Sequence, residues 1–250
     1  MMSQTTFTIP KQFCGPPGSS NGGYFCGTVA SFFDYPVSIR LKAPPPLDTE
    51  MRIEHGDVKA LVLAGDQIIA QVRRADETLE PAPFISVKTA QECSEQGLAG
   101  SLINHPFPGC FVCGPSRASG DGMRIFTGPD RDPALHAASW HAHPAWSSDG
   151  HEIDIPFIWS ALDCPSSGPA FATSIQPDSD IAYVLGTLDI RVTTRPKINE
   201  TYSIVCALDE GDERLYRTRV SLYAQDSTLQ ATGAAIWVQV PRSLFNSPAA

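Results

Sequence analysis

Asn21-Gly22-Gly23 joins a helix-capping residue to two glycines at the start of an apolar segment, Gly22 to Phe33, whose pattern predicts a buried helix. The first N–H groups of a helix have no partner within the helix, and the helix dipole adds to their attraction for negative charge. Glycine lets a carbonyl group approach them closely. Gly22 and Gly23 are therefore candidates for holding an oxyanion, and Asn21 for capping the helix or bonding a ligand. A simple turn with an N-cap is the competing interpretation.

Asp163 is the best candidate for a catalytic acid or base, because it lies on a second apolar segment, Ile155 to Cys164, that also predicts a buried helix. A carboxylate there is suited to act as general base on water or as a nucleophile, and burial would raise its pKa and make it a better base. Because Pro165 follows shortly, a helix-end cap or a turn is the alternative role. Candidates for orienting water or an acyl group are Tyr24, Ser166 and Ser167.

Two shorter motifs resemble a serine-hydrolase motif and half of a zinc site, but the surrounding sequence lacks the other parts of these sites. Gly18-Ser19-Ser20-Asn21-Gly22 fits the nucleophile elbow of serine hydrolases, yet too little chain precedes it to build the required sheet. Cys110-x-x-Cys113, with His105 before it, has the spacing of half a zinc site, but only the pair His141 and His143 could complete it. We therefore expect a tight turn with two small thiols, and neither a metal site nor a cofactor.

Composition excludes several classes of function. The chain has 250 residues, of which 42% are hydrophobic and 18% charged, enough apolar material for a core and too little charge for disorder. Its net charge of −9 and the lack of a basic run argue against nucleic acid as a partner. No apolar run reaches the roughly 18 residues of a membrane span, and the first residues do not resemble a signal peptide. Seven cysteines in an odd, scattered set predict reduced thiols, and we expect a cytoplasmic protein.

An internal repeat divides the chain. The segment Ile39 to Met51 aligns without gaps on Ile190 to Tyr202, an offset of 151 residues, with Ile, Arg and Pro in common. Asp48 and Asn199 both suit the turn that starts the next strand. Each half predicts a buried helix followed by about four antiparallel strands. The strands are expected at Ile53 to Leu63, Ile68 to Arg73, Ala182 to Val192, Tyr202 to Leu208, Arg214 to Tyr223 and Leu229 to Val240. The predicted units are residues 1–90 and 91–250, connected within about 76–104.

Motifs in the second half are similar to those of a known family. Cys110-Phe111-Val112-Cys113-Gly114-Pro115 is followed by Gly120-Asp121-Gly122-Met123-Arg124-Ile125-Phe126, and then by Ser160-Ala161-Leu162-Asp163 on the predicted helix. These segments resemble acyl-CoA thioesterases of the phenylacetate-pathway type, well over residues 105–240 and more weakly over 15–75. With the repeat, the resemblance implies an α+β double hotdog: two curved antiparallel sheets, each wrapped around a central helix.

The family's site residues are split between the two halves. In the family a His-Gly-Gly opens the helix and an acid follows about nine positions later. Here Asn21-Gly22-Gly23 matches the opening, but Ala30 stands where the acid would be, while Asp163 matches the acid and is preceded by Asp154-Ile155-Pro156. Because such helices meet across the subunit interface of hotdog dimers, the resemblance implies that a fused pair assembles one complete and one vestigial site.

The sequence as a whole predicts a protein that binds and hydrolyses an acyl thioester of coenzyme A or of an acyl carrier. Asp163 would activate water or attack, and Gly22 and Gly23 would hold the oxyanion. Two alternatives stay open. One is a non-catalytic acyl-binding protein, and the other is a double-hotdog dehydratase or hydratase using His105 and Asp163. The chain is a pseudo-dimer in itself, and the sequence does not decide whether two chains associate.

Overall fold

The computed structural model describes residues 5–75, 78–212 and 214–245. Residues 1–4, on which the expectation of no signal peptide partly rests, and residues 76–77 of the connection lie outside these ranges. The α-helices are α1 (Gly22–Ala30), α2 (Val87–Asn104), α3 (Ile155–Ser166) and α4 (Gly168–Ser174), and short 3-10 helices lie at Lys11–Phe13, Pro144–Trp146 and Arg242–Phe245. No helix within the described ranges is long and apolar enough to cross a membrane.

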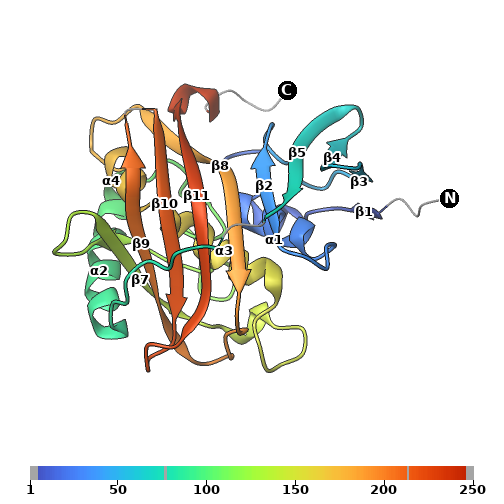
Figure 1. Cartoon of the computed structure of the whole chain (residues 1–250). Coiled ribbons are helices and arrows are strands. Elements are labelled where there is room, and N and C mark those ends of the chain that lie inside the picture. The colour runs from blue at the N-terminus through green and yellow to red at the C-terminus, as the bar shows by residue number, and fades with distance from the viewer. Residues whose placement is uncertain (1–4, 76–77, 213, 246–250) are drawn as a thin grey trace.

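The strands form one antiparallel sheet of eleven, in the order β1-β3-β4-β5-β2-β8-β11-β10-β9-β7-β6. Their bounds are β1 (Thr5–Phe7), β2 (Val37–Leu41), β3 (Met51–His55), β4 (Ala60–Ala64), β5 (Gln67–Arg74), β6 (Gly128–Pro129), β7 (Leu135–His141), β8 (Ile181–Val192), β9 (Thr201–Gly211), β10 (Leu215–Tyr223) and β11 (Leu229–Pro241). Figure 1 shows the helices gathered behind this sheet. The main hydrophobic core lies between the helices and the strands.

The expectation of two separate sheets is wrong, because the strands of both halves hydrogen-bond to each other. β2 pairs antiparallel with β8, with Ser38 opposite Asp189 and Ile39 opposite Leu188. Ser38 and Asp189 are separated by 151 residues, the offset of the sequence repeat. Equivalent positions of the repeat therefore face each other in this pair of strands. An edge strand left open in each half would expose unpaired N–H and C=O groups, and pairing the two edges removes both.

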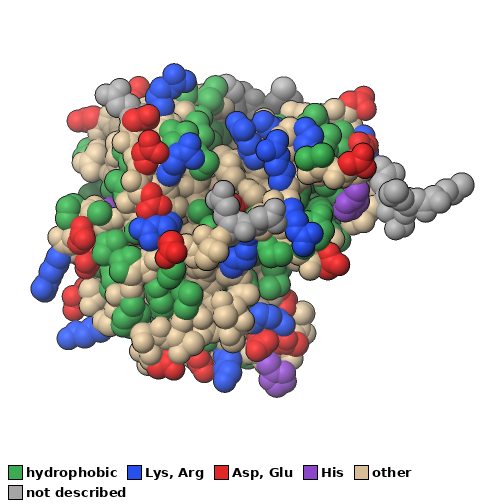
Figure 2. Space-filling view, viewed as in Figure 1, with side chains coloured by type: hydrophobic (Ala, Val, Ile, Leu, Met, Phe, Trp, Pro, Cys, Tyr) green, Lys and Arg blue, Asp and Glu red, His purple; other side chains and the backbone are tan. Residues whose placement is uncertain are grey.

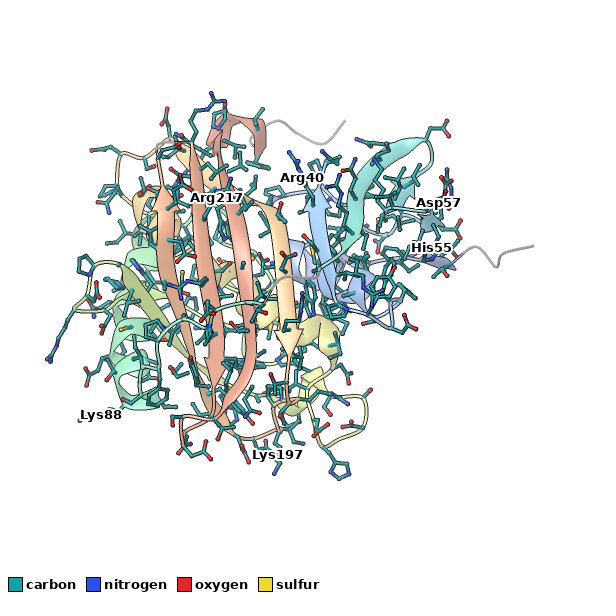
Figure 3. All side chains as sticks on the ribbon, in the orientation of Figure 1. Arg40, His55, Asp57, Lys88, Lys197 and Arg217 are labelled. Carbon is teal, nitrogen blue, oxygen red and sulfur yellow. The ribbon has the colours of Figure 1, made fainter. Side chains whose placement is uncertain are left out.

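The order of elements within each half agrees with the repeat. α1 is followed by the four strands β2 to β5, and α3 and α4 are followed by the four strands β8 to β11. The repeated turn is also present, since Asp48 and Asn199 both adopt positive φ, at 49° and 64°. Short polar side chains tolerate this left-handed conformation because they hydrogen-bond locally. Of the two repeated arginines, Arg40 is exposed on β2 (Figure 3), whereas Arg191 donates to the carbonyl of Ala75.

Several elements differ from the prediction, and β1, β6 and α4 are among those that were not predicted. The single strand expected over Ile53 to Leu63 is two strands, β3 and β4, because Gly56 makes a turn between them. β7 was not predicted. The expected connection contains the helix α2, which packs on β6, β7 and β9. This helix was not predicted because the segment has few large apolar residues. Before α2, residues 78–86 run extended across the outer face of the sheet in Figure 1.

The outer face carries mixed charge except where this connection covers it. Ala82 donates its N–H to Ser221 Oγ, and Phe84 packs edge-on against Tyr223, so the connection buries part of β10. Elsewhere on the face seen in Figure 2, basic and acidic side chains are interspersed.

α1 and α3 contact each other closely because α1 presents glycines to α3. A Cβ atom on Gly27 would lie 2.7 Å from Pro156 Cα and 2.7 Å from Trp159 Cβ. A Cβ on Gly23 would lie 2.4 Å from Asp163 Cβ. The two helices therefore approach to a distance that no larger residue at these positions permits, and this contact brings the start of α1 to the end of α3.

Replacing Gly27 by valine tests this contact. Since backbone and Cβ atoms of α3 cannot move aside cheaply, we expect Gly27→Val to lower the free energy of unfolding by about 2 kcal/mol or more. Chemical denaturation monitored by circular dichroism measures it. Gly109→Val is the control, because a Cβ there meets no atom within 4 Å. An equal loss in both variants would contradict the assignment of Gly27 to a tight helix contact.

Candidate functional site

The start of α1 and the end of α3 place the two predicted parts of the site in direct contact. Asp163 Oδ2 accepts a hydrogen bond of 2.8 Å from the Gly23 N–H and another of 2.8 Å from Asn21 Nδ2. The donors come from the first half of the chain and the carboxylate from the second, 140 and 142 positions away. The structure thus joins the residues that the split motif suggested, across the two halves.

Asn21 uses both ends of its side-chain amide. Its Oδ1 accepts the N–H of Tyr24 at 2.9 Å, which caps α1, and its Nδ2 donates to Asp163. A serine at this position would have to accept from the helix and donate to Asp163 through one oxygen atom. The amide of asparagine carries its acceptor and its donor on two separate atoms. The residue type therefore links the cap of one helix to the carboxylate of the other.

The Asp163 carboxyl is buried, with 2% of the residue exposed. Burial raises the pKa of Asp163 to about 7, and the hydrogen bonds from Gly23 and Asn21 oppose that rise. Its second oxygen, Oδ1, has no hydrogen-bond partner among the described residues. One oxygen is thus fixed by α1, and the other is buried without a hydrogen-bond partner among the described residues.

Asp163 lines a cavity of about 550 Å³. The floor comes from the start of α1 and the end of α3, and the walls from β8, β11, the loop 41–45 and the last 3-10 helix. The wall is mainly apolar, with Phe107, Phe171, Leu185, Trp237, Val240 and Phe245 among its side chains. A predominantly apolar pocket with a few polar groups at one end suits a ligand with an apolar body and one reactive polar group.

The two predicted oxyanion donors have different surroundings. Gly22 lines the cavity, and its N–H makes no hydrogen bond within the described part of the chain. The N–H of Gly23 is instead used by Asp163. A side chain on Gly22 would lie 2.8 Å from Leu185 Cδ2, so the glycine keeps this corner of the cavity open.

The three other residues that were predicted to contact a ligand lie in different surroundings. Ser167 lines the cavity and donates its hydroxyl to the carbonyl of Cys164 at 2.6 Å. Ser166 is fully buried, donates to the Asp163 carbonyl and accepts from Trp237 Nε1, so it braces the end of α3. Tyr24 points into an aromatic cluster, stacked on Phe13, and burial raises its pKa to about 12. Neither Ser166 nor Tyr24 is among the residues that line the cavity.

Cys164 is a site residue that sequence reasoning missed. Its sulfur lies 3.8 Å from that of Cys110 and 3.7 Å from Asn21 Nδ2, and Cys113 joins the group. Hydrogen bonds from the thiols of Cys113 and Cys164 lower the pKa of the Cys110 thiol. The only available signal was that Cys164 directly follows Asp163, which faces the same cavity.

The start of α3, at the other end of the helix pair, makes different contacts from the start of α1. Asp154 is the N-cap residue of α3, as Asn21 is of α1, but its carboxylate accepts from Arg195 Nη2 at 2.9 Å and from the N–H of Ser148. Asp154 is outside the cavity lining. A carboxylate and an arginine occupy this end, where Pro156 also removes an N–H from the start of the helix.

Comparisons with known proteins find similarity in structure alone. No protein-family model matches the chain, and no curated protein matches its sequence. Among solved structures, the dehydratase domain of a mycocerosic acid synthase-like polyketide synthase superposes with a TM-score of 0.62 at 10% identity, covering 95% of this chain and 91% of that one. A proposed thioesterase from Novosphingobium aromaticivorans superposes with a TM-score of 0.55 at 12% identity, covering 94% of each chain.

A third similar structure carries the name of the fold. A protein of unknown function with the hot dog fold, from Alicyclobacillus acidocaldarius, superposes with a TM-score of 0.54 at 10% identity and covers 98% of this chain and 94% of that one. In each case the superposition spans both halves of the chain. This chain therefore has an α+β hotdog fold.

Proposed function

We propose that this chain consists of two fused hotdog units, divided within residues 76–104, and that it hydrolyses an acyl thioester in the cavity beside Asp163. The observation that carries the proposal is that Asp163, which has one carboxylate oxygen without a partner, and Gly22, whose N–H makes no hydrogen bond within the described residues, both line one largely apolar cavity. The similarity to a proposed thioesterase supports the same chemistry. A carboxylate that is fixed through one oxygen keeps the other in a defined position, which a general base requires.

In the proposed reaction, the thioester carbonyl oxygen accepts a hydrogen bond from the Gly22 N–H at the start of α1. Asp163 Oδ1 takes a proton from a water molecule, and the water oxygen adds to the carbonyl carbon. The negative charge that develops on the carbonyl oxygen is stabilised by this N–H and by the helix dipole. The C–S bond then breaks, Asp163 returns the proton to the departing sulfur, and the products are a carboxylic acid and a thiol.

Asn21 and Gly23 act in this proposal as positioning residues. Their donors hold Asp163 Oδ2 at 2.8 Å each, which prevents the carboxylate from rotating. The oxyanion role predicted for Gly23 passes to Gly22 alone, because one N–H cannot serve Asp163 and the substrate together. The acyl group would extend along the apolar wall, with coenzyme A or an acyl carrier as the thiol part, and the chemistry needs no cofactor.

Asp163→Asn is the first test of the reaction. Asparagine keeps an oxygen to accept from Gly23 but cannot take a proton, so we expect kcat to fall by about 10²- to 10⁴-fold. Release of free thiol from short, medium, long and aromatic acyl-CoAs measures turnover. Asp154→Asn is the matched control, since it removes a carboxylate at the other end of α3, outside the cavity. Turnover by Asp163→Asn at the wild-type rate would overturn the proposal.

Leu185→Trp tests whether the cavity holds the acyl chain. Leu185 lies on the wall next to Gly22, and a larger side chain there takes up part of the cavity volume. We expect kcat/KM for long acyl-CoAs to drop by at least about tenfold relative to short ones, because only the long chains lose apolar contacts. Competition between acyl-CoAs of two lengths gives this ratio directly. An unchanged length preference would place the acyl chain elsewhere.

Dehydration or hydration of an acyl thioester is the second candidate function. His105 lies on the wall of the same cavity as Asp163, and the dehydratase domain is a similar structure. However, His105 Nδ1 accepts the N–H of Phe107 at 2.9 Å, which places the ring proton of the neutral imidazole on Nε2. Burial lowers the pKa of His105 to about 4, so the ring is neutral at pH 7. With Nε2 already protonated, His105 is a poor base, and hydrolysis is favoured.

An enoyl-CoA and the corresponding 3-hydroxyacyl-CoA separate the two functions. Hydrolysis releases thiol from both substrates, whereas dehydration or hydration changes the enoyl absorbance and releases no thiol. We expect thiol release alone. A change in enoyl absorbance that His105→Ala abolishes would establish the second function, and saturable binding of acyl-CoA without either change would identify a binding protein.

A further inference from the structure

Three cysteines converge at the inner end of the cavity. The sulfurs of Cys110, Cys113 and Cys164 all lie within 4.8 Å of one another, and those of Cys110 and Cys164 are 3.8 Å apart. All three residues line the cavity. A disulfide requires a separation of about 2.05 Å, and all three are free thiols. Within the described residues, this is the one group of acidic, histidine and cysteine side chains that combines three soft donors in this way.

The spacing fits a tetrahedral metal ion. Zinc binds thiolate sulfur at about 2.3 Å, and two ligands on a tetrahedron of that radius lie about 3.8 Å apart. The observed separation of Cys110 and Cys164 is this distance. Ordinary packing brings two small thiols together often enough, whereas here three of them lie within 4.8 Å of one another.

The fold holds these sulfurs in place through backbone contacts. Cys110 and Cys113 belong to a tight turn closed by the Gly114 N–H, which donates to the Cys110 carbonyl at 2.9 Å. A Cβ on Gly114 would lie 2.4 Å from that carbonyl oxygen, so only glycine fits the turn. Cys164 comes from the last turns of α3, which Asp163 ties to α1. The turn therefore positions Cys110 and Cys113, and α3 positions Cys164, where these two elements meet at the cavity.

A polar contact next to the cluster is also of the kind that surrounds metal thiolates. Asn21 Nδ2 lies 3.7 Å from the Cys164 sulfur, within reach of an N–H···S hydrogen bond. Such donors orient a ligating sulfur and stabilise its negative charge. Cys110 is buried, while Cys113 and Cys164 are partly exposed toward the cavity. An ion could therefore enter from the cavity.

We propose that Cys110, Cys113 and Cys164 bind one zinc ion as thiolates, with the fourth position open to water or to a ligand in the cavity. His105 is not the fourth ligand in this proposal, because it is not part of the group whose donor atoms lie within 4.8 Å of one another. Three protein ligands and an open position are characteristic of zinc sites that bind exchangeable ligands. Neither the general base nor the oxyanion donor of the proposed hydrolysis is a ligand, so the two proposals can be tested separately.

Metal content measured on the whole protein tests the proposal. Protein produced with added zinc, desalted and analysed by mass spectrometry for metals should hold about one ion per chain. Cobalt added to metal-free protein should give intense sulfur-to-metal charge-transfer absorption, which oxygen and nitrogen ligands do not give. Absence of bound zinc together with absence of this absorption would overturn the proposal.

Single cysteine variants locate the ligands. We expect Cys110→Ser, Cys113→Ser and Cys164→Ser each to lose at least about tenfold in zinc affinity, since each removes a thiolate. Cys14→Ser and Cys93→Ser are matched controls because neither residue belongs to the cluster, and both variants should bind zinc normally. Equal loss in the controls, or none in the cluster variants, would contradict the assignment.

Thiol counting on the wild-type chain covers the case in which a serine variant fails to fold. In the reduced native protein, zinc should protect three thiols from a thiol reagent, and a chelator should expose them again. Protection by an oxidised pair instead would persist with chelator and vanish with reductant, which would overturn the metal site. Asp163→Asn should still bind zinc while it loses thioester hydrolysis, so failure of either proposal is distinguishable from failure of the other.

Discussion

Asp163 Oδ2 accepts two hydrogen bonds from the first turn of α1, and the arrangement of the site depends on this contact. Hydrogen bonds to a charged group contribute about 1.5–3 kcal/mol each, while removing a carboxylate from water costs several kcal/mol. The cost of burial exceeds the gain from the two hydrogen bonds, and the pKa of the Asp163 carboxyl therefore rises to about 7. A single donor would leave the carboxylate more costly to bury, and a third would consume the oxygen that the proposed reaction needs.

The same contact explains residue choices that are otherwise unrelated. Position 23 must be glycine because a Cβ would meet Asp163 Cβ at 2.4 Å and the Trp159 carbonyl at 2.7 Å. Position 21 must provide both an acceptor for the helix and a donor for the carboxylate, which asparagine does. Helix contact, helix cap and acid are therefore one unit, and it exists only when both halves of the chain are folded against each other.

Much of this could be predicted from the sequence because the patterns that indicate it are local or repeated. The offset of 151 residues predicted equivalent strands, and Ser38 pairs with Asp189 at that offset. Asp48 and Asn199 predicted turns because their side chains favour such conformations, and both have positive φ. The predictions that failed concern contacts between residues far apart in the sequence. Nothing local says that two predicted sheets share an edge, that the polar segment Val87–Asn104 is a helix, or that Cys164 meets a cysteine pair more than fifty positions away.

The proposed fusion of two similar units would allow the two ends of the helix pair to differ, which a symmetric dimer of identical chains does not. One end combines Asn21 and Gly23 with Asp163 and faces the cavity. At the other end, Asp154 is held by Arg195 and Ser148 outside the cavity lining, and Pro156 gives no N–H. In the proposed reaction an acid is needed on only one helix and a free N–H on only the other, so each helix can lack what its partner supplies. The end without the proposed site holds the ion pair of Asp154 and Arg195, and the other end can have neighbours, such as the three cysteines, without a second copy that must accommodate them.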